Sequence, residues 1–234
     1  MNLQQLTHPV TAASHAFVAA VTISALLLGG FLVAEPQISH GQVETDEFII
    51  TQYITDETSF SVLPTDVVMT GSINGVTGGQ ATGTTDFQVQ SNNSTGYYVE
   101  IRFDNDIGTE AMLGTSTQSQ AIRDFDDGGG EPLFEFTAST AAQFGYTVTS
   151  DTPSDTDGSF LYSGSTCNSG STQAVNQCWK APETTGFRIV DRGTAAPSGA
   201  TSTINFRVNV PSNAVPIPSA ENYIATATLS LFVQ

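Results

Sequence analysis

The chain has 234 residues, of which 23 are Asp or Glu and 6 are Lys or Arg, and its formal net charge is −17. Because so negative a chain repels phosphate groups and anionic lipids, these numbers argue against a nucleic-acid binder and against a protein held electrostatically on a membrane surface. The hydrophobic content of 39% is enough to bury a core, so global disorder is not expected.

The N-terminal region contains an uncharged hydrophobic run over residues 17–34, followed by Pro36 and the small residues Ser39 and Gly41. A hydrophobic stretch, a helix breaker and small residues two positions apart are typical of a secretory signal peptide. We therefore expect residues 1–41 to be a hydrophobic leader helix that is cleaved after Gly41. The remaining chain would then be secreted or displayed at the cell surface.

Other interpretations of the leader remain open. Cleavage after Ala34 is the second choice. Residues 1–16 contain no Lys or Arg, and the hydrophobic run is at the lower edge of membrane-spanning length, so a retained membrane anchor is an alternative. A buried core helix is the third. If the leader is retained, it provides the only expected contact with a membrane.

The region after the leader has the pattern of β-strands. Short runs rich in β-branched residues, with alternating polarity and Gly, Pro, Asn or Asp at their ends, recur along residues 42–234. They cover residues 47–54, 58–63, 67–73, 85–90, 97–103, 133–137, 144–149, 187–190, 203–210 and 223–233. We therefore predict a single all-β domain, an antiparallel β-sandwich of jelly-roll or immunoglobulin-like type with about ten strands.

Turn residues and one weak helical segment complete this prediction. Gly78 and Gly79 supply positions for positive φ angles, and Asn92-Asn93 with Gly96 is expected to close the connection between two strands. Residues 110–123 could hold one short helix, although Gly114 weakens it.

Cys167 and Cys178 are the only cysteines, and they flank a short Gly-, Ser- and Asn-rich loop. In an exported chain two cysteines most simply form a disulfide, which closes the loop and constrains the unfolded chain by about 3 kcal/mol in the entropic model. We expect this disulfide to constrain a long loop region over residues 150–186. Zinc requires four ligands, and all three histidines lie before residue 41, so a metal site at these cysteines is not expected.

Enzymatic chemistry has little support in residues 42–234. Without a histidine there, a Ser-His-Asp or Cys-His mechanism is excluded if the leader is removed. No phosphate-binding or dinucleotide-binding glycine motif is present. Lys180 is the only lysine, and no motif around it supports a catalytic role. Carboxylate pairs can be assembled in any chain this acidic, so they are not specific, and we predict that the protein is not an enzyme.

No cofactor is expected, with calcium as one open possibility. Ca²⁺ takes six to eight oxygen ligands, and two acidic loops could supply some of them. These loops contain Asp151, Asp155 and Asp157 in one case and Asp124, Asp126 and Asp127 in the other. Neither matches the twelve-residue helix–loop–helix pattern, so solvated acidic turns are the simpler interpretation.

Several motifs together resemble a family of exported, Thr/Gly-rich β-sandwich proteins of small-genome bacteria of the candidate-phyla type. The similarity covers nearly all of residues 45–234. The residues that carry it are Phe48, Ile50 and Ile54, Gly71, Gly75, Gly78 and Gly79, Asn92, Asn93 and Gly96, residues 144–148, Cys167, Cys178 and Trp179, and Tyr223, Ala225 and Leu229. The resemblance implies export and a β-sandwich fold. Because the family has no established activity, it implies no catalytic residues. The chain is also loosely similar to surface-fibre and pilus subunits.

We therefore predict a non-enzymatic structural protein that associates with itself. Its first strand after the leader, with Phe48, Ile50 and Ile54 as anchors, could add to the sheet of a neighbouring copy, although pairing within its own sheet is the simpler alternative. A surface adhesin or carbohydrate-binding module, using Tyr97, Tyr98 and Trp179 for stacking, is a second hypothesis. A pilin-like subunit that retains its N-terminal hydrophobic helix is a third.

Overall fold

The computed structural model describes residues 47–104, 110–116, 120–137 and 139–234. The predicted leader, residues 1–41, lies outside the described residues. The chain divides into two units, residues 1–53 and residues 54–234, and only residues 47–53 of the first are described. No helix in the described part of the chain is long and apolar enough to cross a membrane.

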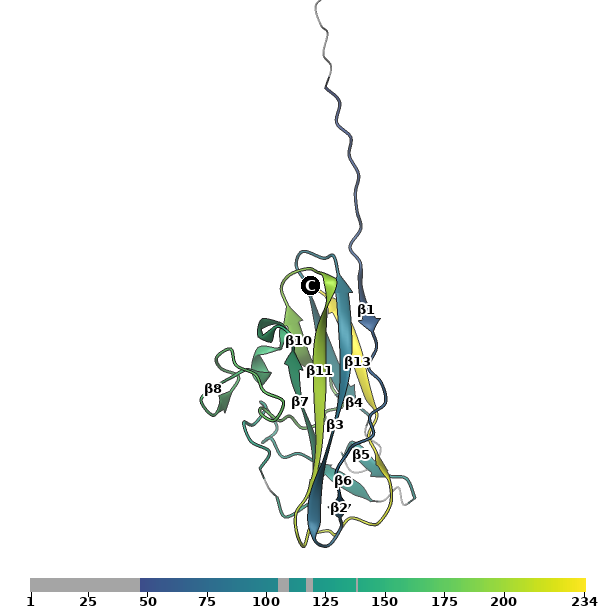
Figure 1. Cartoon of the computed structure of the whole chain (residues 1–234), viewed down its shortest axis with the longest axis vertical. Helices are drawn as coiled ribbons and strands as arrows, with labels where there is room; N and C mark the ends of the chain where they lie inside the picture. The colour runs from purple at the N-terminus through teal and green to yellow at the C-terminus, as the bar shows by residue number, and fades with distance from the viewer. Residues whose placement is uncertain (1–46, 105–109, 117–119, 138) are drawn as a thin grey trace, which may run out of the picture. The chain divides into compact units, whose positions relative to one another are not determined.

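Residues 54–234 form an all-β body with two main sheets (Figure 1). The larger sheet has the order β1-β3-β11-β7-β6-β5-β12, with β2 also paired to β3, and the smaller sheet has the order β10-β4-β13. The strands of the larger sheet are β1 (Thr58–Val62), β2 (Ile73–Asn74), β3 (Gly78–Ser91), β5 (Met112–Gly114), β6 (Ala121–Asp124), β7 (Gln143–Ser150), β11 (Ala196–Val210) and β12 (Tyr223–Ile224). Those of the smaller sheet are β4 (Tyr97–Phe103), β10 (Phe187–Arg192) and β13 (Ala227–Val233).

The connection from β7 to β10 holds most of the irregular structure. It contains two 3₁₀ turns, η1 (Pro153–Asp155) and η2 (Gly158–Phe160), and a small hairpin of β8 (Tyr162–Ser163) and β9 (Thr166–Cys167). Figure 1 shows this hairpin to one side of the main sheets. The Cys167–Cys178 disulfide joins the last residue of this hairpin to Cys178, with a Cα–Cα distance of 5.7 Å, so the predicted disulfide is confirmed.

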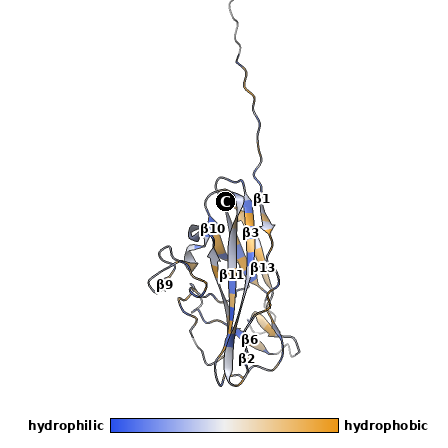
Figure 2. Cartoon of the chain, in the orientation of Figure 1, coloured by the Kyte–Doolittle hydropathy of each residue, from blue (hydrophilic) through white to orange (hydrophobic). Residues whose placement is uncertain are grey.

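The core lies between the two sheets, because each sheet turns one apolar face inward. β3 and β11 pair antiparallel along most of their length, and hydrophobic and hydrophilic residues alternate along them (Figure 2). Phe103 of β4 contacts Phe144 and Tyr146 of β7, with ring centroids 6.0 and 5.4 Å apart. β7 is buried over nearly its whole length on both sides, because irregular segments cover the side that faces away from β4.

The prediction of an all-β fold is confirmed, and many of its strands are found. The run at 97–103 matches β4, and those at 58–63, 85–90, 144–149, 187–190 and 203–210 lie within or overlap β1, β3, β7, β10 and β11. The predicted turns are also present. Gly78, Gly79 and Gly96 have φ angles of 82°, 149° and 87°, and the buried Asn93 side chain accepts a hydrogen bond from the Thr95 N–H at 3.1 Å.

Other elements differ from the prediction. Residues 47–54 and 133–137 contain no strand, although Leu133 forms an isolated bridge with Trp179. The possible helix at 110–123 is instead β5 and β6, and the last predicted strand is divided into β12 and β13. β6 and β7 pair in parallel, so the sheet is not purely antiparallel. The change at 110–123 has a clear cause, because β5 pairs with a partner distant in sequence, Leu113 with Ile224 of β12.

Candidate functional site around Lys180

Lys180, the only lysine of the chain, is completely buried. Its backbone pairs with Tyr146 in β7: the Tyr146 N–H donates to the Lys180 carbonyl at 3.1 Å, and the Lys180 N–H donates to the Tyr146 carbonyl at 2.8 Å. This bridge holds Lys180 beside β7. Its ammonium group lies 4.8 Å from the ring centroid of Phe187 in β10, so the side chain extends from the larger sheet toward the smaller one.

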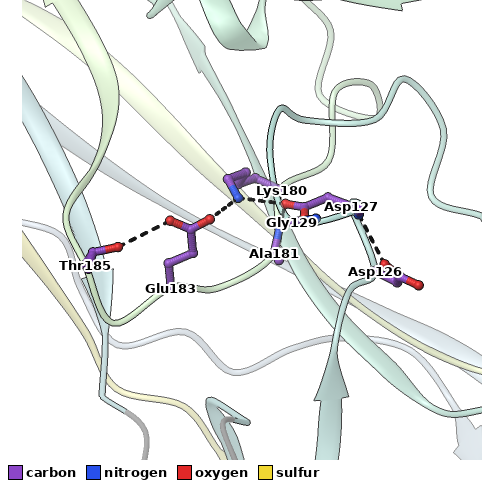
Figure 3. Close-up of polar contacts among 8 residues, drawn as sticks. Asp126, Asp127, Gly129, Lys180, Ala181, Glu183 and Thr185 are labelled. Atoms are coloured by element: carbon purple, nitrogen blue, oxygen red, sulfur yellow. Dashed lines mark hydrogen bonds and ion pairs between the residues drawn. The ribbon is translucent and has the colours of Figure 1, made fainter.

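Two carboxylates hold the ammonium group (Figure 3). Nζ donates to Oδ2 of Asp127 at 2.7 Å and also to Oε1 of Glu183. The Asp127 side chain is 3% exposed, whereas that of Glu183 is 33% exposed. The Lys180–Asp127 pair is therefore almost completely buried, and Glu183 is the more exposed member of the cluster.

Backbone groups fix the Asp127 carboxylate in place. The Gly129 N–H donates to its Oδ1 at 2.9 Å, and the Ala181 N–H donates to its Oδ2 at 3.0 Å. Asp127 lies in the loop that follows β6, whereas Ala181 follows Lys180, so the contacts join two loops far apart in sequence. The backbone donors reduce the desolvation cost of the carboxylate, because charge-assisted hydrogen bonds replace lost water.

Tyr146 completes the surroundings of the cluster. Its hydroxyl is buried and has no hydrogen-bond partner among the described residues. Burial, with smaller contributions from the charges of Glu183 and Asp127, holds the pKa of Tyr146 well above its usual value. The phenol therefore stays neutral and adds no negative charge beside the two carboxylates.

An open acidic depression of about 560 Å³ leads to this cluster. Its lining includes Glu110, Asp124, Asp126, Asp127 and Glu183. Glu110 and Asp124 are linked reciprocally: the Asp124 N–H donates to Oε2 of Glu110 at 2.5 Å, and the Ala111 N–H donates to Oδ1 of Asp124 at 3.0 Å. Because Glu183 lines the depression, water there can reach its outer side.

The burial of Asp124 predicts a pH-dependent stability. Desolvation raises the pKa of Asp124 to about 7, the hydrogen bond from the Ala111 N–H opposes this rise, and the charges of Glu110 and Asp127 add to it. Because the folded state then binds more protons than the unfolded state above the usual pKa of 3.8, the free energy of unfolding falls as the pH rises from there to about 7. After allowance for partial exposure, we expect a loss of about 1–2 kcal/mol.

Urea denaturation of two matched variants tests this expectation. Asp124→Asn should abolish most of the pH dependence between about pH 4 and 8, because the group that titrates is gone. Asp126→Asn removes the same charge at an exposed neighbouring position and should keep the slope. Equal slopes in the two variants would show that Asp124 is not the responsible group.

The residues predicted as calcium ligands have other partners here. Asp155 is buried and pairs with the Arg192 guanidinium, and Asp157 accepts a hydrogen bond from the Ser159 N–H at 3.0 Å at the start of η2, while Asp151 is exposed. In the second loop Asp127 binds Lys180 and Asp124 binds the Ala111 N–H. No group of three or more His, Cys, Asp or Glu side chains in the described part of the chain is arranged to hold a metal ion. Calcium binding stays a prediction.

The aromatic residues predicted for ligand stacking are largely inside the protein. Tyr97 is 1% exposed and Trp179 is 2% exposed, so neither ring is open to a ligand. Trp179 packs edge-on against Phe136, with ring centroids 5.3 Å apart, and its Nε1–H donates to the Asn176 carbonyl at 3.0 Å. Trp179 therefore has a packing role next to the disulfide.

Tyr98 is the one partly exposed member of that group. Its ring stacks on Phe232 of β13, with centroids 4.8 Å apart, and the Arg188 guanidinium lies 4.2 Å from its centroid. Both contacts cross neighbouring strands of the smaller sheet. They occupy the ring, so we assign Tyr98 to packing on the sheet surface.

The Lys180 cluster is not among the sites expected from the sequence. One signal was available: a single lysine among many acids, directly after a disulfide cysteine and a tryptophan. Nothing in the spacing pointed to Asp127, which is 53 residues away.

Comparisons with known proteins give no family. A scan against known protein families finds no match to this chain, and a search of curated proteins finds no match either. The resemblance to exported Thr/Gly-rich β-sandwich proteins therefore stays a prediction.

Proposed function

We propose that the protein is a non-enzymatic structural protein of the cell surface or extracellular space, a β-sandwich that assembles with other copies by β-strand addition. The observation that carries this proposal is a run of exposed apolar residues that follows the predicted cleavage site. Phe48, Ile50 and Ile54 are 81%, 84% and 76% exposed. Clustered apolar side chains left in water mark sites that a partner covers.

The backbone of this run forms no strand, and its contacts with Asn92 begin only at Thr55 and Glu57. Residues 47–57 contain no strand, and alternating positions in the run carry the apolar anchors. An extended segment of this kind can add to a sheet edge, where main-chain hydrogen bonds supply affinity and the anchors supply specificity. We infer that the acceptor is a second copy of this chain.

β13 is the edge best suited to receive it. Within the described residues β13 pairs only with β4, and it offers seven residues, about the length of the apolar run. Its Leu229 and Leu231 pack against the core yet are only partly buried. A neighbouring strand would complete their burial.

The other edges are less suitable. β10 is partly covered, because the Asp157 N–H donates to the Ile189 carbonyl at 3.1 Å and Thr156 bridges Val190. β12 has two residues and β1 has five. Long open edges are the ones that accept a strand, so β13 is preferred.

Removing residues 42–54 tests the role of the segment. We expect the exported protein to form multimers in sedimentation velocity, and the truncated protein to remain monomeric with an unchanged Tm. If assembly survives the deletion and only monomer stability falls, the segment pairs within its own chain and the proposal is wrong.

A matched pair of substitutions sharpens this test. Ile50→Asp places a charge on an anchor, and Thr51→Asp places the same charge on the next residue, which faces the other way in an extended strand. We expect Ile50→Asp to abolish assembly and Thr51→Asp to retain most of it. Equal effects would indicate that charge repulsion, and not strand addition, controls association.

A further inference from the structure

We propose that Lys180 and Asp127 form a covalent amide (isopeptide) bond within the chain, with Glu183 as the group that moves the proton. This inference is independent of the assembly proposed above, because it concerns only contacts inside residues 54–234. It is suggested by the geometry of one amine and two carboxyl groups in an enclosed, largely apolar site.

The reacting groups are already in contact. The Lys180 Nζ is 2.7 Å from Oδ2 of Asp127, so the nitrogen lies next to the carboxyl carbon that it would attack. Both side chains are at most 3% exposed, and two backbone N–H groups hold the carboxylate in one orientation. Fixed proximity of this kind replaces a bimolecular encounter and can accelerate a reaction by many orders of magnitude.

The neutral forms that react arise by proton transfer within the pair. Phe187 lies against the ammonium group, and the neutral Tyr146 hydroxyl has no partner among the described residues. Transfer of one proton from Nζ to Oδ2 of Asp127 along their hydrogen bond converts the ion pair into a neutral amine beside a neutral carboxylic acid.

The bond then forms by loss of water. The Lys180 nitrogen attacks Cγ of Asp127, and negative charge develops on Oδ1, where the Gly129 N–H stabilises it as in an oxyanion hole. Glu183 accepts the second proton from the nitrogen and delivers it to Oδ2, which leaves as water. In total one ammonium and one carboxylate give one amide and one water, Glu183 is unchanged, and no oxidant or cofactor is needed.

The position of Glu183 suits this role. It contacts Nζ on one side and lines the acidic depression on the other, so the released water has an exit. Its backbone is also fixed, because the Phe103 N–H donates to the Glu183 carbonyl at 2.7 Å. The segment from Lys180 to Glu183 thus runs from β7 to the end of β4, and the amide would tie this segment covalently to the loop that follows β6.

Tryptic peptide mapping of the reduced and alkylated full-length protein tests the proposal. Trypsin cuts after Arg and Lys, and between Arg123 and Arg188 the only such site is Lys180. With the amide bond present, Lys180 is not cleaved, and residues 124–188 appear as one peptide lighter than its sequence by one water molecule. Separate peptides 124–180 and 181–188, in full yield and without the mass loss, would overturn the proposal.

Two variants assign the roles, and their folding is checked by circular dichroism. Lys180→Arg keeps the positive charge and the ion pair but has no amine to acylate, so the mass loss must disappear. Glu183→Gln keeps the shape but cannot accept the proton, and we expect bond formation to slow by about a hundredfold or more. An unchanged cross-linked fraction in Glu183→Gln would remove Glu183 from the mechanism. A mass loss that persists in Lys180→Arg would show that another pair reacts.

Discussion

Replacing Lys180 with methionine is expected to lower the free energy of unfolding by about 3–5 kcal/mol, because it leaves the charge of Asp127 buried without its partner. Asp127 is 6% exposed, so little water could replace the ammonium group. Chemical denaturation, followed by tryptophan fluorescence of Trp179, measures the loss.

Two comparisons separate this effect from a general loss of charge. Arg188→Met removes a cation whose pair with Asp191 is exposed, with side chains 42% and 38% accessible, and should cost less than about 1 kcal/mol. Lys180→Met combined with Asp127→Asn should recover part of the stability, because the uncompensated charge is gone. A Lys180→Met loss no larger than that of Arg188→Met would contradict the structure around Lys180.

Replacing both cysteines with serine is expected to destabilise the protein by about 2–4 kcal/mol, since the closed loop no longer restricts the unfolded chain. Cys178 is completely buried and directly precedes Trp179. We therefore also expect the tryptophan emission to shift to longer wavelength as the segment loosens.

The exposed Ser165 in the same hairpin provides a control. Ser165→Ala should change stability by no more than about 0.5 kcal/mol, as surface substitutions usually do. Wild-type protein treated with a reducing agent should behave as the double serine variant does. If the serine variant is as stable as Ser165→Ala, the bridge contributes nothing to the fold.

Strands that alternate strictly and end at turn residues could be predicted from the sequence. Residues 97–103 are the clearest case: their alternation matches the two faces of β4, and Gly96 supplies the positive φ angle that starts the strand. The disulfide was predictable because only two cysteines are present. In each case the signal lies within a few residues of the feature, so no knowledge of distant partners is required.

Features formed by distant partners could not be predicted in this way. The weak helical signal of residues 110–123 is overridden by pairing of β5 with β12, more than a hundred residues away in the chain. The partnership of Lys180 with Asp127 depends on the parallel pairing of β6 with β7, which brings the loop after β6 beside the Tyr146 bridge. Local propensity contains no information on either arrangement.

Assembly through the edge of β13 is tested most directly by cross-linking between two copies. One copy carries Ile50→Cys, and the other carries Leu231→Cys or, as the control on the opposite face of β13, Ser230→Cys. We predict a mixed disulfide dimer of Ile50→Cys with Leu231→Cys and little with Ser230→Cys, because the anchors and Leu231 face the same core. Equal yields from the two partners, or no dimer with either, would contradict strand addition at this edge.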